Sequence, residues 1–287
     1  MKNLIATSFY KYVGLRKVKS FRNEHQKFCN KLEVKGKVLV SKEGINGSIS
    51  GTKEQIGKYK RKLKSYREFN NITFKDTAAT TPPFKKIIVR IRPEIVTNKF
   101  YADIKYAGTY IAPKQLKIMY DKEEDFVIVD ARNDYEWKIG KFRNAITLPI
   151  DVFRDFPHSI KTLEKFKNKK IIMYCTGGVR CEKASALLRQ KGFRDVSQLK
   201  DGIIKFIEEY PDSYFEGRCF VFDDRLSIPS GKNTKDISLC EKCHIPYGKY
   251  KNCKNKKCDR LYLMCDSCTK QHNYACSKMC KLTAKQN

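Results

Sequence analysis

Apolar positions in the first hundred residues alternate between two periods, and this predicts a small domain of mixed strands and helices. Residues 18–33, for example, place Phe21, Phe28, Cys29 and Leu32 near helical spacing. Strands are predicted at residues 4–13, 37–41, 47–50, 72–75 and 86–91, and helices at 18–33 and 52–66. The order β-α-β-β-α-β is typical of ferredoxin-like (acylphosphatase-like) folds. We therefore predict such a domain over residues 1–95.

A different pattern begins near residue 120, where short continuous apolar runs alternate with helical segments. Strands are predicted at residues 126–130, 146–148, 170–174 and 196–199, and helices at 180–190 and 203–210. Buried strands that alternate with helices indicate a parallel sheet covered on both faces. We predict an α/β domain over residues 120–216, preceded by a linker over residues 96–119.

The region from residue 217 to residue 287 has little periodicity, but it is rich in cysteine. Eight cysteines follow one another here: Cys240, Cys243, Cys253, Cys258, Cys265, Cys268, Cys276 and Cys280. Two of the spacings are Cys-x-x-Cys, which delivers two thiolates to one metal ion from a single tight turn. We expect structural zinc held by two four-thiolate sites of unknown pairing, with His244 or His272 as alternatives to one of the thiolates. Iron–sulfur clusters, disulfides or a flexible tail without metal are the alternatives.

Positive charge is concentrated at the two ends of the chain. The formal net charge is +29, and residues 1–95 carry 23 Lys and Arg against 7 Asp and Glu. Residues 231–287 carry 13 against 4, so two basic arms flank a nearly neutral centre. Such an arrangement favours a polyanionic partner such as a nucleic acid. Lysines spread over a solvated surface are the alternative interpretation.

No stretch of the sequence approaches the roughly 20 apolar residues that a membrane span requires. The first residues also lack the apolar run of a secretory signal. We therefore expect a soluble, cytoplasmic protein without membrane contact. In a reducing compartment the 12 cysteines serve metals or chemistry more often than disulfides.

The strand predicted at residues 170–174 leads into the loop Cys175-Thr176-Gly177-Gly178-Val179-Arg180, which opens a helix. A thiol placed there lies beside a helix N-terminus, where backbone N–H groups and the partial positive charge favour the thiolate. Arg180 adds a charge of the same sign, and the two glycines allow the loop amides to converge on one anion. We predict that Cys175 and Arg180 are catalytic and that Thr176, Gly177, Gly178 and Val179 form the active-site loop. A buried, inert cysteine is the alternative.

The residues around this loop resemble a known family. The segments Asp130-Ala131-Arg132-Asn133-Asp134-Tyr135-Glu136 and Leu199-Lys200-Asp201-Gly202-Ile203 are similar to the rhodanese motifs before and after the reactive strand. The loop is one residue shorter than that of phosphatases that use Cys and Arg, and it suits a thiolate or a persulfide. By this resemblance we expect Asp130 and Arg132 to support the active site.

The whole chain, read in order, resembles the rhodanese-related tRNA uridine hydroxylases. The resemblance rests on Lys42-Glu43-Gly44-Ile45-Asn46-Gly47, on the Cys175 loop, on Gly217-Arg218-Cys219-Phe220-Val221-Phe222-Asp223 and on the Cys-rich tail. It implies an oxidoreductase that uses molecular oxygen to convert uridine 34, the wobble position of tRNA, to 5-hydroxyuridine. The electron donor, the tRNAs that are modified and the oligomeric state stay open. Lys42 and Asn46 are candidate RNA contacts, and a plain hairpin turn is the alternative.

Two other functions stay open at this point. One is a sulfurtransferase that carries a persulfide on Cys175, because the six-residue loop suits that chemistry equally well. The other is a non-catalytic tRNA-binding protein, in which the basic arms bind RNA and Cys175 has no chemical role.

Overall fold

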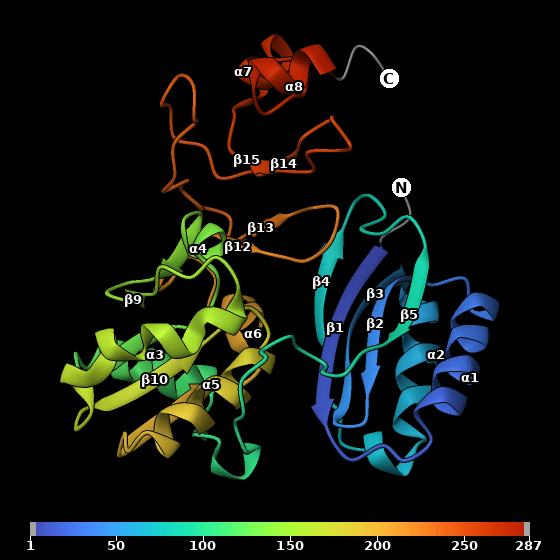
Figure 1. Ribbon diagram of the computed structural model, residues 1–287, viewed down its shortest axis with the longest axis vertical. Helices are drawn as coiled ribbons and strands as arrows, with labels where there is room; N and C mark the ends of the chain where they lie inside the picture. The colour runs from blue at the N-terminus through green and yellow to red at the C-terminus, as the bar shows by residue number, and fades with distance from the viewer. Residues whose placement is uncertain (1–3, 284–287) are drawn as a thin grey trace.

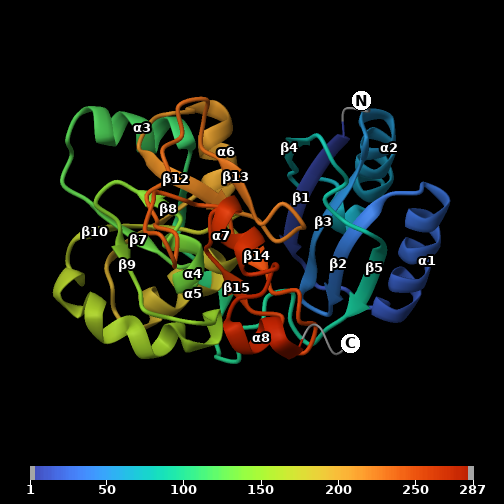
Figure 2. The same ribbon diagram turned by 90° about the horizontal axis from the view of Figure 1, so that it is seen from above.

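The computed structural model describes residues 4–283, which form two lobes side by side with a cysteine-rich region above them (Figure 1). Viewed from above, the cysteine-rich region lies over the boundary between the lobes (Figure 2). The predicted classes of all three parts are confirmed: an α+β lobe, an α/β lobe with a parallel sheet, and a Cys-rich tail. No helix within residues 4–283 is long and apolar enough to cross a membrane.

The N-terminal lobe is one five-stranded sheet with two helices on its outer face (Figure 1). Its strand order is β4-β1-β3-β2-β5. Buried Phe9, Val38 and Ile49 on the sheet pack against Ile56 and Tyr59 of the second helix. Its elements are β1 (Leu4–Tyr12), α1 (Val18–Lys31), β2 (Lys35–Ser41), β3 (Gly44–Thr52), α2 (Lys53–Lys64), η1 (Arg67–Phe69), β4 (Lys75–Ala79) and β5 (Ile87–Ile91).

Helix α2 begins where the sequence predicts. The Thr52 hydroxyl accepts a hydrogen bond from the Gln55 amide, and the Gln55 side chain accepts one from the Thr52 amide, which satisfies two free donors of the first turn. The fourth strand, in contrast, starts at Lys75, whereas the prediction placed it at residues 72–75. Ile72 is buried because it belongs to a turn that packs into the core, where its amide donates to Phe69 instead of to a neighbouring strand.

The hairpin between β2 and β3 is tighter than predicted. Ser41 pairs with Gly44, so only Lys42 and Glu43 form the turn, and Gly44, Ile45 and Asn46 belong to the strand. Gly44 has a φ of +143°, and a Cβ atom there would lie 2.0 Å from the carbonyl oxygen of Lys11. Glycine is therefore required where the end of β1 pairs with the start of β3.

The second lobe has a five-stranded sheet in the order β6-β11-β10-β7-β9, and all of its pairings are parallel. One face packs on α5 and the 3₁₀ segment η3, and the other packs on α3 and α6. Its elements are η2 (Ile104–Tyr106), β6 (Thr109–Ile111), α3 (Pro113–Asp121), β7 (Val127–Asp130), α4 (Asp134–Trp137), β8 (Gly140–Phe142), β9 (Ile146–Thr147), η3 (Phe153–Phe166), β10 (Lys170–Tyr174), α5 (Val179–Gln190), β11 (Asp195–Leu199) and α6 (Gly202–Glu209).

The stretch assigned to a linker, residues 96–119, contains regular structure. Strand β6 pairs with β11 as an edge of the parallel sheet, and α3 covers one face of that sheet. Pro113 is the first residue of α3, a position where its missing N–H costs nothing, so the proline starts a helix instead of ending the segment. The three-residue edge strand is too short to show a periodic pattern.

The C-terminal region leaves the second lobe through β12, which pairs with β8. Its elements are β12 (Phe215–Phe220), β13 (Ser227–Pro229), β14 (Lys251–Asn252), β15 (Leu261–Tyr262), α7 (Asp266–Gln271) and α8 (Lys278–Thr283). Arg225 reaches back to the N-terminal lobe and donates to Thr77 and Ala78. This segment therefore bridges the two lobes near the end of β12.

Candidate active site

A cavity of about 390 Å³ lies between the two lobes. One wall is the open face of the N-terminal sheet, by which we mean the face opposite α1 and α2, with side chains from β1, β2, β3 and β4. The opposite wall includes Cys175 and most of its loop, and Phe222 and Arg225 of the C-terminal region add to it. All three parts of the chain therefore contribute to one site. Its size falls within the usual range of small-ligand pockets.

The sulfur of Cys175 is held as an anion in the wall of this cavity. The side chain is fully buried, and the Gly178 amide donates to its Sγ over 3.1 Å. Burial alone raises the pKa of this thiol, but the Cys181 thiol, the Arg180 charge and the amides of Arg180 and Gly178 outweigh it and lower the pKa to about 5. Cys175 is therefore a thiolate at neutral pH.

Two other buried cysteines show what the loop changes. Cys29 and Cys219 are fully buried, and burial raises the pKa of each to about 12. Burial is common to all three thiols, so the donors of the loop account for the opposite direction at Cys175. Cys181 is also fully buried, but it contacts the Cys175 sulfur. Burial raises its pKa well above the ordinary value, so its protonated thiol donates to Cys175.

Glycines shape the loop. Gly178 precedes α5 with a φ of +97°, and this left-handed conformation turns its amide toward the sulfur. Gly202, at the start of α6, has a φ of +68°, and a Cβ atom there would lie 2.4 Å from the carbonyl oxygen of Cys175. The close approach lets the amides of Ile203 and Ile204 bind the carbonyls of Cys175 and Thr176. The first amides of α6 thus hold the backbone of the loop in place through the carbonyls of Cys175 and Thr176.

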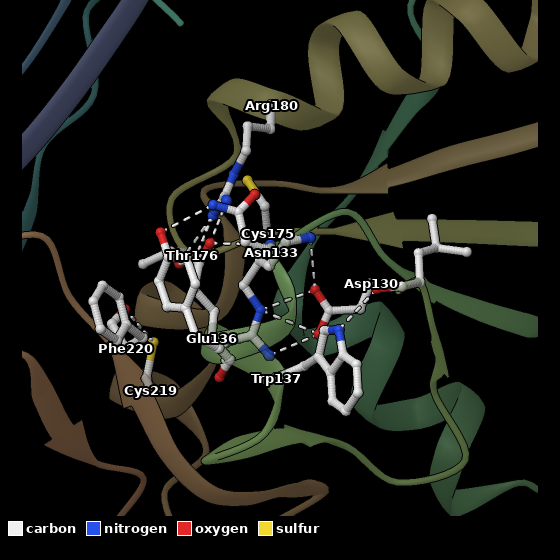
Figure 3. A network of polar contacts seen from close by, with 12 residues as sticks. Asp130, Asn133, Glu136, Trp137, Cys175, Thr176, Arg180, Cys219 and Phe220 are labelled. Carbon is white, nitrogen blue, oxygen red and sulfur yellow. Dashed lines mark hydrogen bonds and ion pairs between the residues drawn. The ribbon is translucent and has the colours of Figure 1, made fainter. Parts of the chain in front are cut away.

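Arg180 is positioned by a buried ion pair with Glu136 (Figure 3). One guanidinium nitrogen lies 2.7 Å from Glu136 Oε1, and the Thr176 hydroxyl donates to the same oxygen over 3.1 Å. Burial raises the pKa of Glu136, but the charges of Arg180 and Arg132 bring it below the ordinary value, so the carboxyl is ionised. Sequence analysis did not assign this role to Glu136, although the residue closes the Asp130–Glu136 motif.

Asp130 and Arg132 form a second, deeper ion pair. Both side chains are fully buried, and the guanidinium lies 2.7 Å from one Asp130 oxygen and 2.6 Å from the carbonyl oxygen of Gly140. Neither residue lines the cavity among the residues described. The pair ties the end of β7 to β8 and so supports the segment that carries Glu136.

The N-terminal lobe contributes a buried lysine that sequence analysis missed. Lys75 begins β4, is 2% exposed, and donates to the Gly177 carbonyl over 3.1 Å. It also lies 3.4 Å from Asp201, at the start of α6. Tyr10 and Glu182 form a second contact between the lobes, with an O–H···O distance of 2.9 Å. No local pattern marks Lys75 among the other lysines of residues 1–95, because its partners lie more than a hundred residues later.

The two candidate RNA contacts lie in different environments. Lys42 is exposed on the β2–β3 turn and is not part of the cavity wall. Asn46 lines the cavity, and its side-chain amide donates to the Ile95 carbonyl over 2.8 Å. An RNA role for either residue stays a prediction.

The eight cysteines of the tail gather into two groups, and this gives the pairing that the sequence left open. Within each group all sulfur atoms lie within 4.8 Å of one another. Tetrahedral zinc with Zn–S bonds of about 2.3 Å requires sulfur atoms about 3.8 Å apart. The sulfur atoms lie 3.6 Å apart in Cys243–Cys265 and 3.7 Å apart in Cys258–Cys276, so both groups fit such an ion. The groups are Cys240, Cys243, Cys265 and Cys268, and Cys253, Cys258, Cys276 and Cys280.

Comparisons with known proteins cover nearly the whole chain. Residues 4–95 match the family described as UPF0176 acylphosphatase like domain, residues 112–209 the Rhodanese-like domain, and residues 216–281 the Rhodanase C-terminal family. A tRNA uridine(34) hydroxylase of Cytophaga hutchinsonii is 39% identical over 284 residues, which are 98% of this chain and 91% of that protein. The chain belongs to the tRNA uridine(34) hydroxylase family. A Bacillus cereus protein of the same name is 41% identical over 286 residues, with 96% of this chain and 88% of that protein covered.

Solved structures similar to this member of the hydroxylase family include a rhodanese-like domain from Anabaena. That domain is 28% identical, and the match covers 38% of this chain and 78% of the domain with a TM-score of 0.33. In this member of the hydroxylase family the two predicted catalytic residues, Cys175 and Arg180, both line the cavity. Thr176, Gly177 and Val179 of the same loop line it as well.

Proposed function

We propose that this protein hydroxylates uridine 34 of tRNA to 5-hydroxyuridine and that Cys175 is its nucleophile. The observation that carries the proposal is the Cys175 sulfur in the wall of a cavity between the lobes, where the Gly178 amide donates to it over 3.1 Å and the charge of Arg180 helps to lower its pKa. A cavity of about 390 Å³ has room for one unstacked base, which enzymes acting on nucleobases extrude from its neighbours. The relatives from Cytophaga hutchinsonii and Bacillus cereus are named as hydroxylases of uridine 34 of tRNA, which supports the proposal.

The chemistry begins with a bond between the sulfur and C6 of uracil. As this bond forms, the π bond between C5 and C6 breaks, and its electron pair moves to C5 and is delocalised through the C4 carbonyl onto its exocyclic oxygen, O4. Arg180 and the loop amides stay close to this anionic centre and stabilise the charge as it moves. The same positive groups therefore stabilise the thiolate before the reaction and the negatively charged adduct after it.

Molecular oxygen is the co-substrate, and it takes up the electron pair at C5. One oxygen atom stays on C5 as the hydroxyl group, and the other leaves as water with two electrons and, in net terms, two protons from an external two-electron donor. Loss of the C5 proton and departure of the Cys175 thiolate then restore the double bond. The protein thus ends the cycle in its starting state.

Positive charge supports tRNA as the substrate. The N-terminal lobe, with 23 basic residues against 7 acidic ones in residues 1–95, forms one wall of the cavity. Phosphate contacts supply affinity and position without reading the sequence, so a basic lobe beside the reactive sulfur suits an anticodon loop. We place the reaction in the cytoplasm, together with its tRNA substrate.

Structural zinc in the tail is the second part of the proposal. When bound, zinc would crosslink a region that has few apolar side chains of its own. We expect two zinc ions per chain by native mass spectrometry, and one in each of the variants Cys243→Ala and Cys258→Ala, which remove one ligand from a different group. Iron in the purified protein, or no bound metal, would contradict this assignment.

The activity itself is tested by nucleoside analysis of tRNA from cells with and without the gene. We expect 5-hydroxyuridine at position 34 to disappear on deletion and to return with the wild-type gene. Unchanged 5-hydroxyuridine in the deletion strain, together with transfer of sulfur from thiosulfate to cyanide by the purified protein, would favour the sulfurtransferase instead.

A further inference from the structure

Two polar atoms in the cavity wall have no hydrogen-bond partner among residues 4–283. One is Oγ of Ser8 on β1, and the other is Oδ1 of Asn133, which lies just before α4. Asn133 is 8% exposed, and its side-chain nitrogen is already used, because it donates to the Tyr135 hydroxyl over 2.9 Å. Buried polar atoms carry an energetic penalty until they are paired. The two atoms come from different lobes and line the same cavity as Cys175, so a ligand between the lobes is their natural partner.

Lys75 stands next to Ser8 on the open face of the sheet. The two residues are register partners on the antiparallel strands β1 and β4, so their side chains leave the sheet on the same side. An ammonium group has three N–H donors, and the Gly177 carbonyl and Asp201 engage two of them. The sheet therefore presents a hydroxyl and an ammonium side by side, and the opposite wall presents an amide oxygen.

We propose that these three groups recognise the base as uracil. The Asn133 amide oxygen accepts a hydrogen bond from the ring N3–H, and the Ser8 hydroxyl and the Lys75 ammonium donate to the neighbouring O4. Cytosine has a lone pair at N3 and an amino group at C4. Its N3 would therefore face the Asn133 oxygen, acceptor against acceptor, and its amino group would face the donors of Ser8 and Lys75. This inference deepens the proposed function and rests on it.

The same contacts assist the reaction. When the Cys175 sulfur adds to C6, O4 gains negative charge, and a cation already placed at O4 stabilises the adduct more than the free base. Lys75 comes from the N-terminal lobe, so this lobe supplies part of the chemistry in addition to RNA binding. The active site is complete only when the two lobes are docked.

The test uses anticodon stem-loops with U34 or C34 and two pairs of matched variants. Ser8→Ala and Asn133→Ala are expected to lower kcat/KM for the U34 stem-loop by roughly 5- to 150-fold, the effect of leaving a buried polar group of the substrate unpaired. The inhibition constant of the C34 stem-loop, which reports general RNA binding, should change less than about 3-fold because that binding depends on phosphate contacts. Ser8→Thr keeps the hydroxyl and is expected to restore most of the activity.

Two control variants change residues that resemble or contact Ser8 and Asn133 but do not line the cavity. Thr7 also has a buried hydroxyl without a partner among the residues described, but it does not line the cavity, so Thr7→Val should retain activity. Tyr135→Phe removes the partner of the Asn133 nitrogen and leaves the oxygen in place. If Ser8→Ala and Asn133→Ala behave like these controls, or if U34 turnover and C34 binding fall together, the inference is overturned.

Lys75 requires a separate readout because its charge also acts on Cys175. Lys75→Met is expected to lower kcat by roughly 10²- to 10³-fold at pH 8, where the sulfur stays ionised. The control is Lys60→Met. Lys60 lies on α2 and pairs with Asp76, which follows Lys75 on β4, and its replacement should have little effect. A loss that vanishes at alkaline pH would show that Lys75 acts only through the thiolate. Product formation by Cys175→Ser would defeat the proposed function itself, whereas an inactive Cys175→Ser beside an active Lys75→Met would defeat only this inference.

Discussion

Replacing Cys175 by serine is expected to lower the rate of 5-hydroxyuridine formation by roughly 10³-fold or more, the scale seen when a nucleophile is removed. Serine is similar in size, so the loop should keep its shape. A hydroxyl group, however, is not ionised by donors that hold a thiol at a pKa of about 5. The measurement is single-turnover hydroxylation of a U34 stem-loop by the purified protein.

Cys219→Ser is the matched control for this substitution. Cys219 is equally buried, but burial raises its pKa to about 12, so no thiolate is lost. We expect activity close to that of the wild type per folded molecule. Equal activity of the Cys175→Ser and wild-type proteins would eliminate the sulfur from the mechanism.

The pH dependence follows from the same sulfur. An acid with a pKa of about 5 is deprotonated above that value, so activity should rise as the pH increases through 5 and level off near neutrality. Cys181→Ala removes one donor to the thiolate and should move this rise upward by about one to two pH units. A hydrogen bond to a charged group contributes about 1.5–3 kcal/mol, and 1.36 kcal/mol corresponds to one pH unit. Cys181→Ser keeps a donor and should stay near the wild-type profile.

Replacing Glu136 by glutamine is expected to cause the largest loss of stability of any single substitution considered. Glu136 and Arg180 are both buried, and removal of one partner leaves the other charge unpaired, which costs about 3–5 kcal/mol. For a chain of 287 residues, with an unfolding entropy of about 2.1 cal/mol/K per residue, the melting temperature should fall by about 5–8 °C. The orientation of Arg180 should be lost as well, so the activity of the remaining folded protein should also decrease.

Glu54→Gln is the control for that experiment. Glu54 pairs with Lys58 on the exposed side of α2, and both side chains are largely in solvent. Exposed pairs contribute little, so the melting temperature should not change measurably. If the two variants melt at the same temperature, the buried pair does not hold the site together.

Local sequence was sufficient to predict the reactive loop. The strand before Cys175, the glycines after it and the helix that starts near Arg180 are contiguous, so their geometry follows from chain connectivity. The same holds for the Thr52 cap and for the parallel sheet, where β10 was predicted at its observed bounds. The reactive loop and the Thr52 cap depend on interactions within a few residues, and each strand of the parallel sheet was recognised from its own apolar run, although β10 pairs with β7 and β11 over longer separations.

The rest of the site depends on contacts between distant segments. Lys75 is one basic residue among 23 in its lobe, and only the docking of the lobes brings it to Gly177. The pairing of the tail cysteines likewise requires two segments to cross, because Cys240 and Cys243 skip Cys253 and Cys258 to meet Cys265. The ion pair of Glu136 with Arg180 could have been predicted from the sequence. Glu136 closes the motif that precedes the reactive loop, and an acid buried there needs a cation as its partner. The roles of Asn133 and Ser8 could not be predicted, because a polar atom is known to lack a partner only when its surroundings are known.

The central claim is that the Cys175 sulfur attacks a uracil base, and covalent trapping tests it most directly. An anticodon stem-loop with 5-fluorouridine at position 34 should form an adduct in which sulfur is bonded to C6 and a proton is added to C5. Incubation without oxygen followed by mass spectrometry of the digested complex should find the nucleotide on the peptide that contains Cys175, and Cys175→Ser should give none. An adduct on another residue, or no adduct from a protein that hydroxylates the U34 stem-loop, would contradict the account.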